Sequence, residues 1–241
     1  MPFDVTKFGL AEMLRLGIDI RKTMATRETF ESAAQSVCEH LYHDLTGPTG
    51  DRACALVRCY KTHPFAELPL DLKDFAKVSL PSETPRPSMK CLTLMGTVGD
   101  EPEWNSRSGS RGHKAIPLPS PEIVEQAPMI AQLLRQFGLD LSELLDPGKE
   151  VVRDLMGKTY GVFHVADARG SRFIPAQEEF VLRHGIRSVL GFGGSLATSD
   201  LFAVILFSKF AIPESSADRF RTVALDVKSG FFKLREAVFA A

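Results

Sequence analysis

The stretch that decides the fold is residues 186–213, IRSVLGFGGSLATSDLFAVILFSKFAIP. It holds two apolar runs, SVLGFGGSL and LFAVILFSKF, which are joined by the polar link ATSD and stopped by Pro213. Residues 201–207 are continuously apolar, as is typical of a strand that is covered on both faces of a sheet. The sequence therefore predicts two successive strands, the second of them in the middle of a sheet.

The glycines of GFGG raise the question of a nucleotide site. A dinucleotide fingerprint requires GxGxxG between a strand and a helix. Here Leu196 stands where the third glycine belongs after Gly191 and Gly193, and a second strand follows in place of a helix. A phosphate loop would also need GK[ST] after its glycines, and none follows here. We therefore interpret these glycines as positions of bulging or of close backbone approach within a strand.

Composition and charge exclude several classes of protein. The chain has 241 residues, 44% hydrophobic and 24% charged, and a net charge of −1, so no basic field indicates a nucleic-acid partner. Four cysteines form no CxxC pair and no zinc-type spacing, which favours a reducing compartment. The N-terminus lacks a signal-peptide core, and no run of about 18 apolar residues occurs. We expect a protein of the bacterial cytoplasm with no membrane insertion.

Helices and strands occupy the rest of the chain. Apolar spacing predicts a helix within residues 5–23 and a second helix that starts at Thr26. Runs of apolar residues predict strands over residues 53–60, 91–99 and 160–168, and AIPLP after Lys114 reads as a short edge strand. Short helices are predicted after Pro69 and over residues 176–185, and longer ones over residues 120–145, with a bend near Pro128, and over residues 214–238. The last helix carries one apolar face, formed by Phe220, Val223, Ala224, Val227 and Phe231. This face is longer than one domain edge needs, so we expect it to form the contact of a helix-mediated dimer.

The predicted order of elements carries a resemblance to a known family. Strand, tight link, strongly apolar strand, proline and acid-capped helix resemble the end of a GAF domain, with IRSVLGF at the position of a typical GAF strand. ACALVRCY and CLTLMGTVG match earlier GAF strands, so the resemblance covers residues 26–235 in order and residues 186–230 in detail. The chain is also similar to N-terminal GAF-type regions of bacterial signal-transduction proteins, which precede histidine kinase or phosphatase modules.

This resemblance implies an α+β, GAF/PAS-like fold, with a central antiparallel sheet flanked by helices and with long N- and C-terminal helices. The terminal helices would pack together on one face and form a homodimer, and a ligand pocket would lie on the other face. We expect an N-terminal helix over residues 1–25 and a single domain over residues 26–241, whose middle segment, residues 100–160, is enlarged. The cyclic-nucleotide and bilin signatures of GAF domains are absent, so no cofactor can be named.

Candidate ligand-binding residues lie in two places. In NSRSGSRGHK, the cations Arg107, Arg111 and His113 suit an anion, and Trp104 would form an apolar lid over them. The alternative is a solvated flexible loop. In VFHVADA, strand alternation places Phe163 and His164 on opposite faces. GAF resemblance implies that such a histidine can meet a small ligand, whereas a hydrogen-bonded core histidine is the alternative.

Two functions of different classes follow. The first is a sensory domain that binds a small molecule or a partner, and that signals through dimerised terminal helices to a kinase or phosphatase module. The second is a small α/β enzyme that acts on an anionic substrate with His164 or His113 and with Arg107 and Arg111. A purely structural dimer is a third reading, because a GAF-like fold does not specify a ligand. The sequence leaves open whether the protein is an enzyme.

Overall fold

The computed structural model describes residues 2–80, 84–137, 145, 160–196, 200–234 and 238–239. Its main sheet has six strands: β3 (Cys54–Pro64), β4 (Lys90–Gly99), β5 (Ala115–Leu118), β6 (Tyr160–Val165), β7 (Ser188–Ser195) and β8 (Leu201–Ser208). Their spatial order is β5-β4-β3-β8-β7-β6, and every neighbouring pair is antiparallel. A separate parallel pair joins β1 (Phe3–Asp4) to β2 (Leu45–Thr46). The central antiparallel sheet expected from the sequence is confirmed.

The stretch that decides the fold forms the middle of this sheet. β7 pairs with β8 from Ser188 opposite Ser208 to Ser195 opposite Leu201, without a shift of register. β8 lies between β7 and β3 and is buried along its whole length, as the continuous apolar run predicted. The backbone N–H of Leu196 donates a hydrogen bond of 2.7 Å to the carbonyl oxygen of Asp200, which continues the contact between the two strands beyond Ser195 and Leu201.

The glycines of β7 permit close backbone approach. A Cβ atom on Gly193 would lie 2.1 Å from the carbonyl oxygen of Phe202, and one on Gly191 would lie 3.3 Å from the Cβ of Phe163. The regular register excludes a bulge within the paired residues of β7. Close approach, one of the two readings of GFGG, is therefore confirmed.

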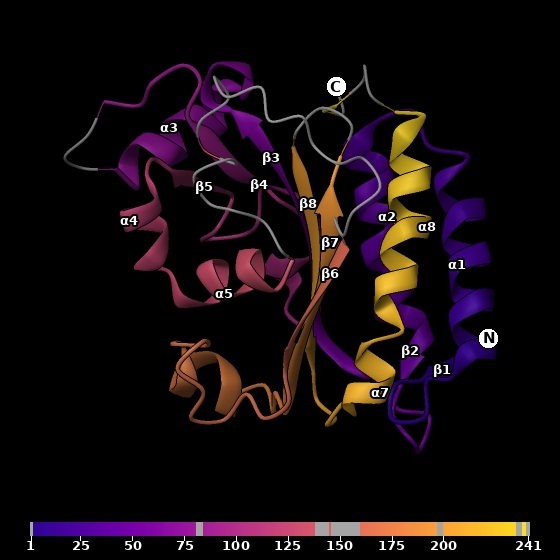
Figure 1. The fold of residues 1–241 in the computed structure, drawn as a ribbon. Coiled ribbons are helices and arrows are strands. Elements are labelled where there is room, and N and C mark those ends of the chain that lie inside the picture. The colour runs from indigo at the N-terminus through magenta and orange to yellow at the C-terminus, as the bar shows by residue number, and fades with distance from the viewer. Residues whose placement is uncertain are drawn as a thin grey trace.

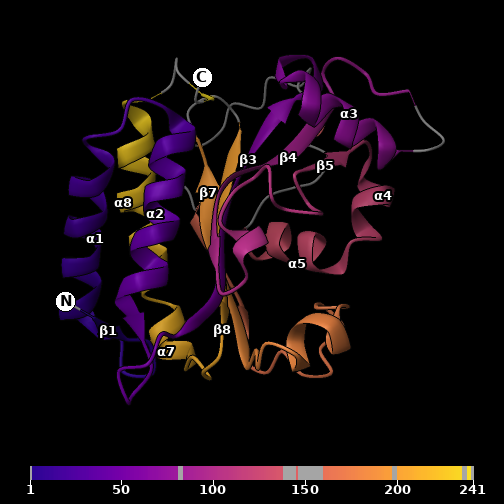
Figure 2. The same cartoon turned by 180° about the vertical axis from the view of Figure 1, so that it is seen from behind.

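Helices cover both faces of the sheet (Figures 1 and 2). One face carries the helix layer, which we define as α1 (Leu10–Met24), α2 (Phe30–Asp44), α7 (Glu214–Ala217) and α8 (Phe220–Phe232). The opposite side carries α3 (Leu70–Val78), α4 (Pro121–Glu125), α5 (Pro128–Gln136) and the π-helical segment η3 (Gln177–Leu182). Two short 3₁₀ turns, η1 (Phe65–Glu67) and η2 (Pro102–Trp104), follow β3 and β4. Among the described residues, none of the helices has the length and apolar character that a membrane span requires.

The second helix begins at a different residue from the one that the sequence predicted. Thr29, not Thr26, is the N-cap of α2, because its hydroxyl accepts a hydrogen bond of 3.0 Å from the backbone N–H of Ser32. Thr26 donates its hydroxyl to the carbonyl oxygen of Thr23, at 3.1 Å, and so belongs to the end of α1. The helix expected from Thr26 therefore begins at Phe30.

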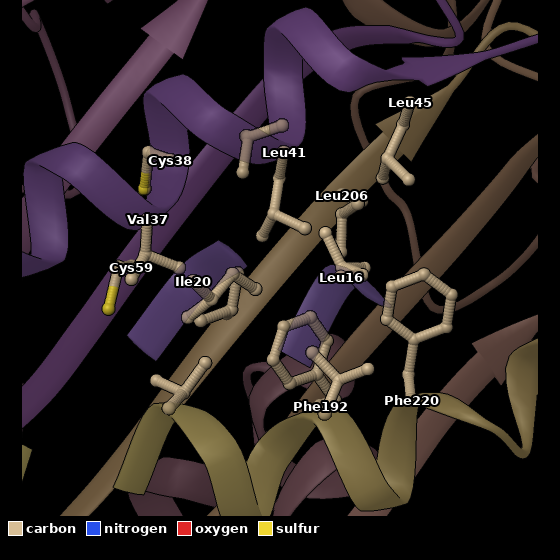
Figure 3. Packing of buried hydrophobic residues seen from close by; sticks show 14 of the residues in the cluster. Leu16, Ile20, Val37, Cys38, Leu41, Leu45, Cys59, Phe192, Leu206 and Phe220 are labelled. Carbon is tan, nitrogen blue, oxygen red and sulfur yellow. The ribbon is translucent and has the colours of Figure 1, made fainter. Parts of the chain in front are cut away.

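Between the sheet and the helix layer lies the larger core (Figure 3). Leu16 of α1, Leu41 of α2 and Phe220 of α8 converge there on Phe192 and Leu206 of the sheet. The N- and C-terminal helices pack together, as expected. For example, Arg21 of α1 forms an ion pair with Asp226 of α8, and Phe8, which precedes α1, stacks on Phe220 with ring centroids 4.8 Å apart.

The apolar face predicted for the last helix is part of this core. Val223 and Val227 are completely buried, and Phe231 is 2% exposed. These residues fill the interior of one chain, so they cannot form the dimer contact expected of that face. The helix is also shorter than residues 214–238, because α7 and α8 are separate and α8 ends at Phe232.

The enlarged middle segment contributes an edge strand and helices. β5 forms the edge next to β4, as predicted for AIPLP. The helix predicted over residues 120–145 is divided into α4 and α5, with the break just before Pro128. Residues 138–144 and 146–159 of this segment lie outside the described residues.

Candidate functional site: a charged cavity between the sheet and α8

A cavity of about 250 Å³ lies at one end of the sheet, on the side of the helix layer. Its walls come from the start of α2, the end of β3, the start of β4, the residues that directly follow β7 and precede β8, and the end of α8 with the residues after it. Phe30 and Phe231, whose rings stack with centroids 3.8 Å apart, form part of the apolar wall. GAF resemblance implied a pocket on the opposite face, so this cavity was not expected.

Three buried charged side chains form the base of the cavity. The Nζ of Lys61 lies 2.9 Å from Asp200 Oδ2, and the Nζ of Lys90 lies 2.7 Å from Asp200 Oδ1. All three residues are less than one-tenth exposed. Lys61 also donates to the carbonyl oxygen of Thr62, at 3.0 Å. We call Lys61, Lys90 and Asp200 the charged cluster.

Strand register brings the charged cluster together. Lys61 pairs with Phe202 in the β3–β8 ladder, so it lies beside the residues that lead into β8. Lys90 is opposite Pro64 at the end of β3. The backbone N–H of Leu201 donates to Thr62 Oγ1, at 2.9 Å, which holds the start of β8 against β3.

The charges of the cluster shift each other's pKa values. Burial by itself would raise the pKa of the Asp200 carboxyl, but the charges of Lys61 and Lys90 and their hydrogen bonds hold that pKa below its usual value. Burial lowers the pKa of the Lys61 ammonium, and Asp200 opposes this effect only in part. Asp200 is therefore an anion at neutral pH, held between two lysines.

His63 adds a neutral polar group to the cavity wall. The residue is 1% exposed, and among the described residues neither ring nitrogen meets the geometry of a hydrogen bond to a partner. Its ring lies 5.2 Å from that of Phe239, measured between centroids. Burial, together with the charge of Lys61, lowers its pKa to about 3, so the imidazole is neutral at physiological pH.

The outer part of the cavity is partly polar and partly apolar. Lys228 and Glu67 line it, and the Nζ of Lys228 also lies 4.9 Å from the centre of the Tyr160 ring. Leu196 and Val238 contribute apolar surface. A concave site with mostly apolar walls and a few convergent charged groups is the usual form of a small-molecule site.

The loop residues predicted to hold an anion are paired within the protein. Arg107 forms an ion pair of 2.6 Å with Glu31, and the exposed Arg111 pairs with Glu103. His113 is exposed and has a φ of 60°, in the left-handed region. The charges of both arginines are thus already balanced by carboxylates.

Trp104, Phe163 and His164 lie elsewhere. Trp104 packs on the side of α5 and η3, where its ring centroid is 4.7 Å from that of His184. Phe163 is completely buried in the same cluster of apolar residues. His164 faces the other way, toward the helix layer, as strand alternation predicted. Its pKa is lowered by burial.

None of the six predicted site residues lines the cavity. Three strands separate β6, which carries His164, from β4, which precedes the arginine loop. Strands lie about 4.8 Å apart, so these two elements are roughly 19 Å from each other. The structure therefore brings Arg107, Arg111 and His113 into one loop but does not join them to His164. Ligand binding by the six stays a prediction.

The sequence contains a signal for the charged cluster. Lys61 lies within RCYKTHP, Lys90 directly precedes CLTL, and Asp200 directly precedes LFAVILF, so each charge borders or interrupts an apolar strand. Charged residues are almost never fully buried unless they are paired.

The described residues contain no group of three His, Cys, Asp or Glu side chains that could hold a metal ion.

Comparisons with known proteins agree with the fold. No family model and no curated protein matches the sequence. A free methionine-R-sulfoxide reductase from Neisseria meningitidis, solved with its substrate, has a similar structure, with a TM-score of 0.52 and 11% identity over 95% of this chain and 93% of that chain. The GAF domain of a phosphoenolpyruvate-protein phosphotransferase from Coxiella burnetii matches with a TM-score of 0.48 and 12% identity, over 92% of this chain and 94% of that chain.

The phycoerythrobilin-bound GAF domain of a cyanobacterial phytochrome matches with a TM-score of 0.45 and 8% identity, over 92% of this chain and 96% of that chain. The six-stranded antiparallel sheet between helices is the architecture that the sequence predicted from its resemblance to GAF domains. At these identities the likeness concerns the fold alone.

Proposed function

We propose that the chain is a regulatory, GAF-like domain that binds a small molecule in the cavity between the sheet and α8. The observation that carries this proposal is the charged cluster at the base of that cavity, Lys61, Lys90 and Asp200. Burying three charged side chains costs free energy that apolar residues would not cost. A binding role for these charges accounts for their place at the wall of a cavity.

The position of the cavity supports a route from ligand to output. Phe231 of α8 lines the cavity and stacks on Phe30 of α2. One residue earlier, a Cβ atom on Gly230 would lie 2.4 Å from the Sδ of Met24 in α1, so α8 and α1 are in close contact. A ligand that pushes on Phe231 would therefore shift α8 against α1 and α2. The output module, a histidine kinase or a phosphatase, stays a prediction, as do the cytoplasmic location and the absence of a nucleic-acid partner.

A homodimer stays part of the proposal, but on a different surface. Leu10, Leu14 and Ile18 of α1 are 57%, 54% and 42% exposed, and they follow each other at intervals of one helical turn. Leu225 of α8, the helix that packs beside α1, is 43% exposed. We assign the dimer contact to these four residues, because the face that the sequence favoured lies in the core.

A thermal-shift screen of small metabolites tests ligand binding. Leu196→Trp places a large ring at the cavity wall, and Val78→Trp adds the same ring at an 82% exposed position on α3. We expect at least one compound to raise the melting temperature of the wild type and of Val78→Trp but not of Leu196→Trp. A compound that stabilises all three proteins equally binds elsewhere, and that result overturns the proposal.

The alternative, an enzyme, has less support. His164 is far from Arg107 and Arg111 across the sheet, as described above. The similar protein from Neisseria meningitidis is by name a sulfoxide reductase. Reduction by a protein thiol needs an accessible thiolate, whereas all four cysteines here are buried, and burial raises the pKa of Cys54 and of Cys91 to about 12. These thiols are unsuited to that chemistry.

A further inference from the structure

We propose that the ligand of the cavity is a small monocarboxylate with an apolar body, and that Lys61 and Lys90 bind its carboxylate group. This inference rests on the proposed function and adds the chemical class of the ligand. Three independent features of the cavity carry it: its charge, its unused hydrogen-bond donors and its apolar walls.

The net charge of the side chains around the cavity favours a ligand with one negative charge. Two buried ammonium groups, those of Lys61 and Lys90, share the single carboxylate of Asp200. Among the described residues, no other carboxylate lies within 4.0 Å of either ammonium. Lys228 and Glu67 also line the cavity, and the charge of Glu67 acts on Lys61. The described residues of the lining thus include three lysines and two carboxylates, a formal excess of one positive charge, and burial of such a charge is costly. A monoanion would neutralise it.

The same lysines have hydrogen-bond donors left over. An ammonium group carries three N–H donors and no acceptor. Lys61 uses two of them, on Asp200 and on the carbonyl oxygen of Thr62, and Lys90 uses one, on Asp200. Within the described part of the chain, three N–H groups are thus unused at the cavity base. A carboxylate has two oxygens that accept such charge-assisted bonds.

The remaining walls suit an apolar body. Phe30, Leu196, Phe231 and Val238 line the cavity together with the neutral ring of His63. The cavity of about 250 Å³ is far larger than the roughly 10–15 Å³ that a single water molecule needs. That space holds a phenyl ring or a short alkyl chain with a carboxylate. A dianion would leave a negative charge beside Asp200, and a cation would meet two lysines.

A series of three probes with the same body tests the charge requirement. Phenylacetate, phenylacetamide and 2-phenylethylamine carry charges of −1, 0 and +1, and each is titrated to millimolar concentration into ¹⁵N-labelled protein while amide resonances are followed. We expect phenylacetate to shift the resonances of residues around the cavity. We expect its affinity to exceed that of the amide by roughly tenfold to a hundredfold, the usual worth of hydrogen bonds to a charged group.

Lys90→Met is the matched variant. It removes one positive charge and leaves the Lys61–Asp200 pair intact, so we expect phenylacetate affinity to fall by at least about tenfold. Lys77→Met, which removes an exposed lysine of α3 paired with Asp74, is the control that should keep full affinity. Dispersed resonances in each variant confirm that the fold is retained.

The outcomes separate this inference from the proposed function. If the amide or the amine binds at the cavity as tightly as phenylacetate, or if Lys90→Met leaves phenylacetate affinity unchanged, the carboxylate assignment fails and a small-molecule cavity remains. If none of the three probes shifts a resonance of the cavity residues, the carboxylate assignment fails and the cavity loses its support as a ligand site.

Discussion

The Nζ of Lys90 lies 2.7 Å from Asp200 Oδ1, although the two residues are 110 positions apart in the chain. This contact joins the first residue of β4 to the residue before β8, and Lys61 binds the second carboxylate oxygen from β3. Among the described residues, Asp200 is thus the anion that ties three strands together at the base of the cavity. Its removal should destabilise the fold much more than the removal of one lysine.

We expect Asp200→Asn to lower the free energy of unfolding by about 3–5 kcal/mol, because it leaves two buried ammonium ions side by side without an anion. Lys90→Met should change it by less than about 1 kcal/mol, because the variant keeps a neutral Lys61–Asp200 pair and removes the uncompensated charge. Urea unfolding followed by circular dichroism measures both values. Equal losses in the two variants would show that the cluster does not act as a two-lysine, one-carboxylate unit.

His63 should contribute to the pH dependence of the free energy of unfolding. In the folded protein the pKa of His63 is lowered to about 3, whereas in the unfolded chain a histidine binds its proton near pH 6.5. Between these values the unfolded state binds more protons, so the free energy of unfolding falls as the pH falls. The contribution of His63 to this loss is about 2 kcal/mol between pH 7 and pH 5.

His63→Phe keeps a ring beside Phe239 and removes this titration. Denaturant titrations of the wild type and the variant at pH 7 and pH 5 compare the two losses, which should differ by about 2 kcal/mol. Some loss should remain in the variant, because the pKa values of His40 and His164 are also lowered by burial. Identical losses in the two proteins would mean that His63 accepts a proton in the folded state.

Close packing of α2 on β4 depends on Gly96. A Cβ atom at this position would lie 2.6 Å from the carbonyl carbon and oxygen of Ala34, in the backbone of α2. We expect Gly96→Ala to cost about 1–3 kcal/mol of stability, because the backbone of the helix would have to move. Gly112→Ala is the control, since a Cβ atom there meets nothing within 4 Å and should change stability by less than about 0.5 kcal/mol. Thermal unfolding of both variants checks the difference.

Two glutamate substitutions separate the core face of the last helix from the exposed stripe of α1. Val227 is completely buried, so Val227→Glu should prevent folding by placing a charge in the core. Leu14 is 54% exposed, so Leu14→Glu should fold normally and should convert the proposed dimer into a monomer. Native mass spectrometry reports the oligomeric state, with circular dichroism as the check of folding. A Leu14→Glu protein that stays dimeric would remove α1 from the interface.

Local patterns were sufficient for most of the fold. The apolar run over residues 201–207 predicted a central strand because a strand covered on both faces needs apolar side chains on both faces, and β8 has this position. The prediction that Phe163 and His164 lie on opposite faces of the sheet was also correct, because successive side chains of a strand point to opposite faces. The start of α2 was misplaced by a few residues, because Thr26 and Thr29 both suit a cap and only the course of α1 selects between them.

The sequence by itself determined the order of the main strands and helices along the chain, the α+β class and the apolar face of the last helix, because each depends on side chains that are near one another along the chain. Only the tertiary structure decided which groups form a site. Lys61 and Asp200 are 139 positions apart, and strand register alone brings them into contact. In the same way, the core face of α8 and an exposed stripe on α1 look alike as apolar spacing, and only packing shows which one is covered.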